Sequence, residues 1–122
     1  MDERIRFISH QGEQILLVDL SSCSPREVEK IARTVPDYVT VRPLRSVLLL
    51  ADFTGASFDL EATRAMKESA VFDKPHIKKS AWIGAGNVPE KVYEELKSFS
   101  RREFPAFRTR QEALAWLVGG GK

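Results

Sequence analysis

The spacing of apolar and polar residues predicts alternating strands and helices along the chain. Charged and apolar residues alternate at the start of residues 4–9, as in a half-exposed strand, and residues 15–18 form a continuous apolar run of strand length. The turn residues 11–13 between these segments predict an antiparallel hairpin. Residues 46–52 are the most apolar segment and lack alternation, which indicates a strand buried on both faces.

The first helix is predicted by its capping residues. Ser24, Pro25 and Glu27 form a capping box, because the serine and glutamate side chains satisfy amide hydrogens that have no partner inside the helix. Its apolar face is expected to consist of Val28, Ile31, Ala32 and Val35. We expect Pro36 to kink or interrupt this helix, since proline has no amide hydrogen to donate.

The rest of the chain continues the alternation of helix and strand. Asp59 is expected to cap a second helix that ends near residue 72. The later elements are expected to be a strand over 76–83, a turn over 84–87, a helix over 89–101, a short strand over 106–108, and a last helix that opens with a second capping box at residues 109–112. The helix over 89–101 is expected to bury Val88, Val92, Leu96 and Phe99.

This element order, ββαβαβα(β)α, predicts an α/β fold. The sheet is expected to be mixed but mainly parallel, with the N-terminal antiparallel hairpin at its edge and about four helices. The chain has 122 residues, which suits one hydrophobic core. We therefore expect a single domain over residues 1–118, followed by a flexible tail over residues 119–122.

Composition narrows the class of protein. The chain is 43% hydrophobic and 30% charged, as in a soluble globular protein. No apolar run reaches the ~18 residues that cross a bilayer, and the first residues lack the layout of a signal peptide, so we expect no transmembrane segment and a cytoplasmic location. Cys23, His10 and His76 are too few for a disulfide framework or a zinc site, and we expect no metal and no cofactor.

Charge is distributed unevenly along the chain. The formal net charge is only +2, which is too small to predict nucleic-acid binding. Residues 1–73 carry nine basic and twelve acidic side chains, a net charge of −3, whereas residues 74–122 carry ten basic and five acidic ones, a net charge of +5. The basic half would suit an acidic partner, but its aromatic residues fit a core better than a base-stacking platform, so we expect no nucleic acid.

Polar residues gather after the most buried strand, at Asp52, Thr54, Ser57 and Asp59. Loops at the carboxyl ends of parallel strands commonly bind ligands or partners, so these four residues are the candidate binding site. A structural role is the favoured alternative, because Asp59 can cap a helix while Asp52 and Thr54 satisfy loop amides. The turn that starts at Gly84 is likewise interpreted as a tight turn with an Asn87 cap, rather than as a phosphate loop.

Several segments together resemble a known family. They are SVLLLADFTG at 46–55, KPHIKKSAWIG at 74–84, FSR at 99–101 and TRQEALAWL at 109–117. In these segments the chain is similar to small bacterial proteins grouped with the STAS domains, relatives of sporulation anti-sigma-factor antagonists whose fold is shared with the lipid-binding SEC14 (CRAL-TRIO) domains. The resemblance covers nearly the whole chain and implies a β-α superhelix with sequential strand neighbours.

The resemblance also implies a regulatory loop. STAS antagonists are phosphorylated on a serine in an Asp-Ser-Ser-Gly type loop after the third strand. In one register residues 60–62 of this chain, Leu-Glu-Ala, stand where that family has Ser-Ser-Gly, so the phosphorylatable serine is missing. In another register Thr54 is the acceptor. Both registers leave the phospho-switch open.

Two classes of function follow, and neither is enzymatic. The leading hypothesis is a non-catalytic regulatory domain that binds a protein partner through the loop and helix after the third strand. The alternative, by analogy with SEC14, is a protein that binds a small apolar ligand or lipid, with Phe58, Met66, Phe72 and Trp82 as its lining; the competing explanation of these four is an ordinary core. A homodimer through the open edge of the first strand is a further hypothesis, although Arg4 and Arg6 disfavour it.

Overall fold

A five-stranded sheet forms the centre of the molecule in the computed structural model, which describes residues 4–119. The elements in chain order are β1 (Ile5–His10), β2 (Glu13–Asp19), α1 (Pro25–Val39), β3 (Val47–Asp52), α2 (Leu60–Asp73), η2 (Lys74–His76), β4 (Ile77–Ile83), η3 (Ala85–Asn87), α3 (Glu90–Ser100), β5 (Ala106–Phe107) and α4 (Arg110–Gly119), where η marks a short 3-10 helix.

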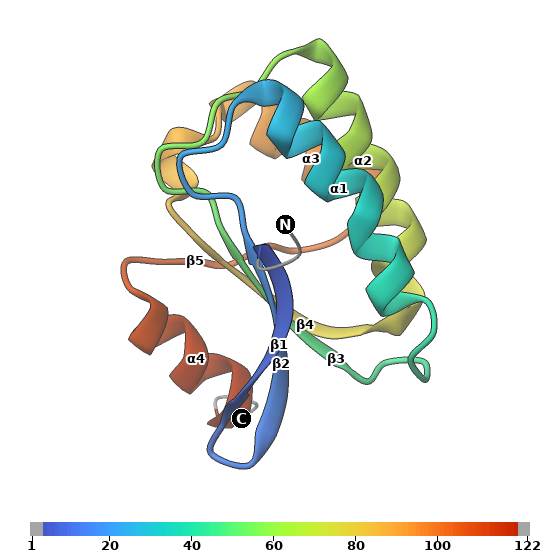
Figure 1. The fold of residues 1–122 in the computed structure, drawn as a ribbon, viewed down its shortest axis with the longest axis vertical. Helices are drawn as coiled ribbons and strands as arrows, with labels where there is room; N and C mark the ends of the chain where they lie inside the picture. The colour runs from blue at the N-terminus through green and yellow to red at the C-terminus, as the bar shows by residue number, and fades with distance from the viewer. Residues whose placement is uncertain (1–3, 120–122) are drawn as a thin grey trace.

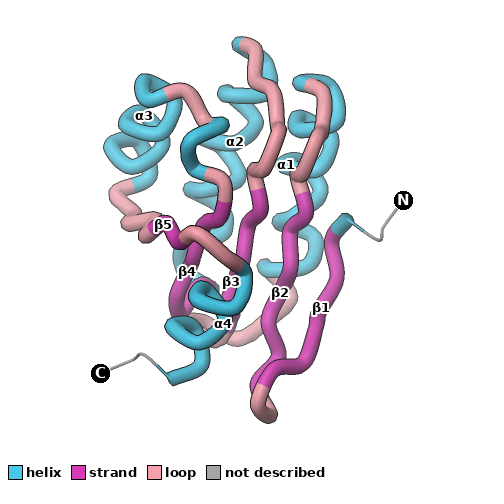
Figure 2. The backbone as a smooth tube through the Cα atoms, turned by 90° about the vertical axis from the view of Figure 1, so that its left-hand side faces the viewer, coloured by secondary structure: helices cyan, strands magenta, loops and turns pink. Residues whose placement is uncertain are grey.

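The strands lie side by side in their chain order, β1-β2-β3-β4-β5. β1 pairs with β2 antiparallel, and each later pair is parallel. Helices α1, α2 and α3 cover one face of the sheet, while α4 lies on the other face (Figure 1). The view in Figure 2, with α4 in front, shows the strands in sequence with the hairpin at one edge. The α/β class, the mainly parallel sheet and the edge position of the hairpin are therefore confirmed.

Two apolar layers follow from the alternation of side chains along the strands. Leu49 and Ala51 of β3 belong to the larger core with the helices α1 to α3, whereas Leu48 and Leu50 belong to the smaller core with α4. All six residues of β3 are buried. The prediction that this strand is buried on both faces is confirmed, and the reason is that a helix layer covers each side.

The predicted capping box of α1 is present, but the helix is not interrupted at Pro36. Ser24 Oγ accepts a hydrogen bond from the Glu27 amide at 3.2 Å, and Glu27 Oε1 accepts one from the Ser24 amide at 2.9 Å. The helix runs through Pro36 without interruption to Val39. Val39 is fully buried in the main core, so its packing offsets the helix hydrogen bond that Pro36 cannot donate.

Two other predictions need correction in the last third of the chain. Phe99 is 57% exposed rather than buried, because Ser100, four residues after the buried Leu96, takes the inward position on α3. Gly119, which we expected in the flexible tail, is the last residue of α4; the rest of that tail, 120–122, lies outside the described residues. Thr109 does accept a bond from the Glu112 amide, at 3.1 Å, as its capping role predicts.

Gly84 is the position at which the turn after β4 depends most on glycine. Its φ is +73°, and a Cβ there would lie 2.5 Å from the backbone nitrogen of Thr54. We expect Gly84→Ala to lower the free energy of unfolding by roughly 1–3 kcal/mol, since it adds backbone strain and a contact with main-chain atoms that cannot move aside cheaply.

Urea denaturation followed by circular dichroism measures this effect. Gly86→Ala in the same turn is the matched control, because a Cβ there meets nothing within 4 Å. We expect the control to change stability by less than ~0.5 kcal/mol. Equal stability of the two variants would show that the turn does not need glycine at residue 84.

Candidate functional site

Three loops meet at the carboxyl ends of β2, β3 and β4. We call them the loop platform, and they comprise residues 20–24, 53–59 and 84–88. Parallel strands place their carboxyl ends at the same edge of the sheet, and Figure 2 shows these loops side by side above it. Thr54, Ser57 and Asp59, three of the four predicted binding residues, lie in the platform, and Asp52 directly precedes it.

Hydrogen bonds join the three loops to one another. The Ser22 amide donates to the Thr54 carbonyl at 2.7 Å, which links the first loop to the second. The Gly55 amide donates to Asn87 Oδ1 at 2.8 Å, which links the second loop to the third. The prediction that Asn87 caps the following helix is therefore wrong: the N-cap of α3 is Pro89, and Asn87 links two loops. Because neighbouring loops share backbone hydrogen bonds, the platform is held as one unit.

The same short turn occurs at the ends of β2 and β3. Asp52 Oδ1 accepts the Thr54 amide at 3.0 Å and the Thr54 hydroxyl at 2.7 Å. Asp19 Oδ1 accepts the Ser21 amide at 3.0 Å and the Ser21 hydroxyl at 2.6 Å. Asp19 and Asp52 are register partners on adjacent strands, so the two turns stand side by side. The structural role predicted for Asp52 and Thr54 is present in this geometry.

Two arginines face these carboxylates. Arg110, the first residue of α4, donates from Nη2 at 2.8 Å and from Nε at 3.1 Å to Asp52 Oδ2, and its Nη2 lies 3.8 Å from Asp19 Oδ1. Arg4 Nη1 donates to the Ser21 carbonyl at 2.8 Å and lies 3.6 Å from Asp19 Oδ1. The site therefore contains two carboxylates and two guanidinium groups, whose charges balance.

The Asp52 carboxyl stays ionised in this setting. Its burial raises the pKa, but the hydrogen bonds from the Thr54 hydroxyl and amide and the Arg110 guanidinium together outweigh burial, so the pKa of Asp52 lies below its ordinary value. Both of its oxygens accept hydrogen bonds. Asp52 is thus a structural anion that organises the loop and not a poised proton donor or acceptor.

Ser57 and Asp59, the other two predicted site residues, do not bond to Asp52 or Thr54 and have separate roles. Asp59 accepts the Ala62 amide at 2.8 Å and caps α2. Ser57 is exposed, and its amide donates to the Cys23 carbonyl at 3.0 Å. The structure therefore brings Asp52 and Thr54 together but not Ser57 and Asp59. From the sequence, Arg110 belongs only to the basic half of the chain, because nothing local links it to Asp52, 58 positions away.

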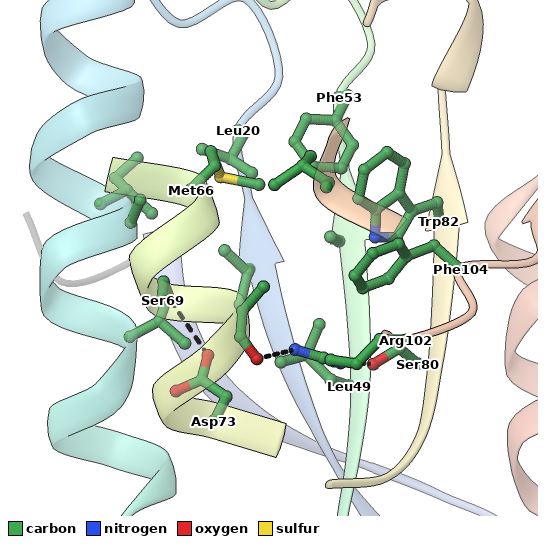
Figure 3. A pocket seen from close by; sticks show the side chains of 17 residues that line it. Leu20, Leu49, Phe53, Met66, Ser69, Asp73, Ser80, Trp82, Arg102 and Phe104 are labelled. Carbon is green, nitrogen blue, oxygen red and sulfur yellow. Dashed lines mark hydrogen bonds between the residues drawn. The ribbon is translucent and has the colours of Figure 1, made fainter. Parts of the chain in front are cut away.

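A small cavity lies between the sheet and the helices α1 to α3 (Figure 3). Its volume is about 50 Å³, and its wall is mainly apolar. Met66 and Trp82, two of the four residues predicted to line a ligand pocket, lie on this wall. Phe72 is instead 62% exposed on α2, and Phe58 packs on Phe53 with ring centroids 5.9 Å apart.

Polar groups close one end of the cavity. Arg102 donates from Nη1 to the Ala70 carbonyl at 3.0 Å and from Nη2 to Ser80 Oγ at 2.6 Å, as Figure 3 shows. Asp73 accepts the Ser69 hydroxyl at 3.0 Å through Oδ2, while its buried Oδ1 has no hydrogen-bond partner among residues 4–119. Burial raises the pKa of Asp73 to about 6 and lowers the pKa of Arg102 to about 10.

Other reactive groups are kept apart from the platform surface. Cys23 is 2% exposed, and burial raises the pKa of its thiol, which disfavours the nucleophilic thiolate. Within residues 4–119 no three His, Cys, Asp or Glu side chains come together in a way that could hold a metal ion. In the same part of the chain, no helix has the length and apolar character required to cross a membrane.

Comparison with known proteins finds no match of the chain to a protein-family model, to a curated protein or to a solved structure. The resemblance to the STAS and SEC14 families therefore stays a prediction, although the sequential strand order that it implies is present.

The buried carboxyl of Asp73 predicts a pH dependence of stability. A carboxyl whose pKa is raised on folding stabilises the fold when protonated; that contribution is complete below the unfolded value of about 4 and is lost as the pH rises through the folded value. The free energy of unfolding should therefore fall between roughly pH 4 and the folded pKa of about 6. Asp73→Asn, which cannot ionise, should remove this part of the slope.

Urea unfolding at a series of pH values tests the effect. Asp37→Asn, at an exposed position on α1, is the matched control and should keep the slope of the unaltered protein. A slope in Asp73→Asn identical to that of the control would contradict the assignment. The comparison uses the slope, so a change in overall stability caused by the substitution does not affect it.

Proposed function

We propose that this protein is a non-catalytic regulatory domain that binds a protein partner through the loop platform and the adjoining start of α2. The observation that carries the proposal is the set of hydrogen bonds between neighbouring loops, from Ser22 to Thr54 and from Gly55 to Asn87. A surface held in one conformation before binding loses little conformational entropy when a partner docks. The platform therefore suits recognition by a preformed surface.

The groups that the platform leaves accessible are those of a contact surface. Ser22 and Thr54 are exposed, and Leu60 at the start of α2 is 73% exposed. Ser22 has a φ of +55°, an uncommon conformation for a residue with a side chain. The hydrogen bond from its amide to the Thr54 carbonyl stabilises this conformation. Exposed hydroxyls on the platform and an exposed apolar side chain at the start of α2 offer a partner both hydrogen bonds and a hydrophobic contact.

The chemistry of the site favours binding over catalysis. Both oxygens of Asp52 are engaged, and its pKa lies below the range in which it would exchange protons near neutrality. The Cys23 thiol is buried and biased toward its neutral form. A buried free thiol also suits a reducing compartment, so a cytoplasmic location is part of the proposal.

A phospho-switch at Thr54 has less support than binding. The Thr54 hydroxyl already donates to Asp52 at 2.7 Å. A phosphate on that oxygen would remove the donated hydrogen bond and add up to about two negative charges beside a carboxylate. Phosphorylation would therefore disrupt the platform, and the proposed function does not depend on it.

The apolar-ligand alternative rests on the cavity beside Met66 and Trp82. Its volume of about 50 Å³ is far below the ~300–1000 Å³ of pockets that enclose drug-sized ligands. A lipid chain would need movement of the helices that cover the sheet. The cavity therefore favours the alternative only weakly, and the loop platform carries the proposed function.

Affinity capture with immobilised variants tests the proposal in extracts of the cell that makes the protein. Leu60→Asp places a charge on the platform rim, and Leu44→Asp, at another exposed leucine in the loop between α1 and β3, is the matched control. A partner retained by the unaltered protein should also be retained by the control. Leu60→Asp should lower its affinity by at least about tenfold, which corresponds to ~1.4 kcal/mol.

Two results would contradict the proposal. One is equal retention of every captured protein by both leucine variants, which would place the contact elsewhere on the molecule. The other is the absence of any protein above background in repeated captures with the unaltered domain. Circular dichroism of each variant shows that the fold is intact before the capture is interpreted.

A further inference from the structure

A second surface lies at the β4 edge of the sheet, apart from the loop platform. It is a groove of about 750 Å³, and none of its lining residues belongs to the platform. We call it the basic groove and define it by its six cationic residues, Arg45, Lys74, Lys78, Lys79, Arg101 and Arg102. Among the described residues, Glu103 is the one acidic residue in its lining. The groove therefore concentrates positive charge in a concave surface.

Within the described residues, the positive charge of the basic groove is compensated only in part, through the attraction between Arg102 and the buried Asp73. Elsewhere, cations such as Arg33 and Lys67 lie within 3.3 Å of a carboxylate. None of the six groove cations has a carboxylate oxygen within 4.0 Å in residues 4–119. Lys74 and Lys79 instead donate to backbone carbonyls, at 3.2 and 3.1 Å. The groove thus offers charge that an acidic partner can neutralise.

The groove also follows an incomplete sheet edge. β5 pairs only with Trp82 and Ile83 at the end of β4, and Figure 2 shows β5 beside that end alone. The Trp82 amide donates toward this side, to the Pro105 carbonyl at 2.9 Å. Because amide direction alternates along a strand, the Ser80 amide faces the same side, where no strand lies next to it in the described part of the chain. Ser80 is only 5% exposed, so an added strand would pair first at the more exposed residues 77–79 and reach Ser80 last.

Protection of the edge explains only part of this charge. Lysines and bulges on edge strands prevent unwanted pairing, and β4 has both, since its register with β3 shifts next to Lys78. Arg45, Lys74 and Arg101, however, reach the groove from segments outside β4. Their convergence adds charge that protection of the strand does not need. Such an edge repels neutral or basic strands and accepts an acidic one.

We propose that the basic groove binds an acidic, extended peptide segment of a partner protein, which adds beside residues 77–81 of β4 with its carboxylates against the groove cations. A single-stranded nucleic acid fits less well, because its bases need an accessible aromatic face. Trp116 is the one aromatic residue in the lining; it packs on Phe107 with ring centroids 5.6 Å apart, and Lys79 Nζ lies 4.8 Å from its ring centroid.

Fluorescence anisotropy with a labelled peptide of alternating glutamate and valine tests the proposal. The unaltered protein should bind it, and binding should weaken as salt rises from roughly 50 to 300 mM, because exposed charges are screened. The double variant Lys78→Glu with Arg101→Glu should weaken binding by about tenfold or more. Both positions are exposed, so the variant should keep its circular dichroism spectrum.

Three controls distinguish charge, backbone pairing and location. Lys30→Glu with Lys91→Glu makes the same charge change at exposed positions on helices outside the groove, and it should change the affinity by less than about twofold. A peptide N-methylated at alternate residues cannot pair with the strand and should bind at least about tenfold more weakly. Leu60→Asp, at the start of α2 beside the loop platform, should not affect peptide binding.

Each alternative result would overturn the proposal. Equal losses in the two double variants would mean attraction by net charge alone. Unchanged affinity of the N-methylated peptide would exclude strand addition, and tighter binding of an oligothymidylate of equal charge would assign the groove to nucleic acid. Because Leu60→Asp reports on the platform alone, failure of the groove proposal and failure of the proposed function give different results.

Discussion

The ion pair between Arg110 and Asp52 joins the two faces of the sheet at the point where its central strand ends. Arg110 begins the helix that covers one face, and Asp52 closes β3, whose neighbouring residues pack under the helices of the other face. Asp52 is 6% exposed, and a carboxylate so buried is costly without a cation and hydrogen-bond donors. The pair therefore both positions α4 and stabilises the loop that follows β3.

The loop platform follows from this junction. With Oδ2 of Asp52 held by Arg110, Oδ1 is directed to the amide and hydroxyl of Thr54, and the Thr54 carbonyl accepts the Ser22 amide of the next loop. Charge is balanced around Asp19 and Asp52, and the exposed residues beside them, Ser22 and Thr54, carry hydroxyls. The basic groove differs, because none of its cations has a carboxylate within 4.0 Å among the described residues, and because β5 covers only the end of β4.

Local signals in the sequence predict most of the fold. The capping box at Ser24 and the continuous apolar run of β3 depend on residues close in the chain, and both predictions are confirmed. Features decided by distant contacts were not predictable. Pro36 stays inside a helix because core packing holds the next turn, and Phe99 is exposed because of how α3 meets the sheet. The pairing of Asp52 with Arg110 spans 58 positions and has no local pattern.

The coupling between Arg110 and Asp52 is the quantity on which this account depends most directly. A double-mutant cycle of Arg110→Met, Asp52→Asn and the combined variant, followed by urea unfolding near neutral pH, measures it. The account predicts a favourable coupling energy of roughly 1 kcal/mol or more, because each single variant leaves the other group without its partner. Additive effects of the two substitutions, with no coupling, would contradict a central role for this ion pair.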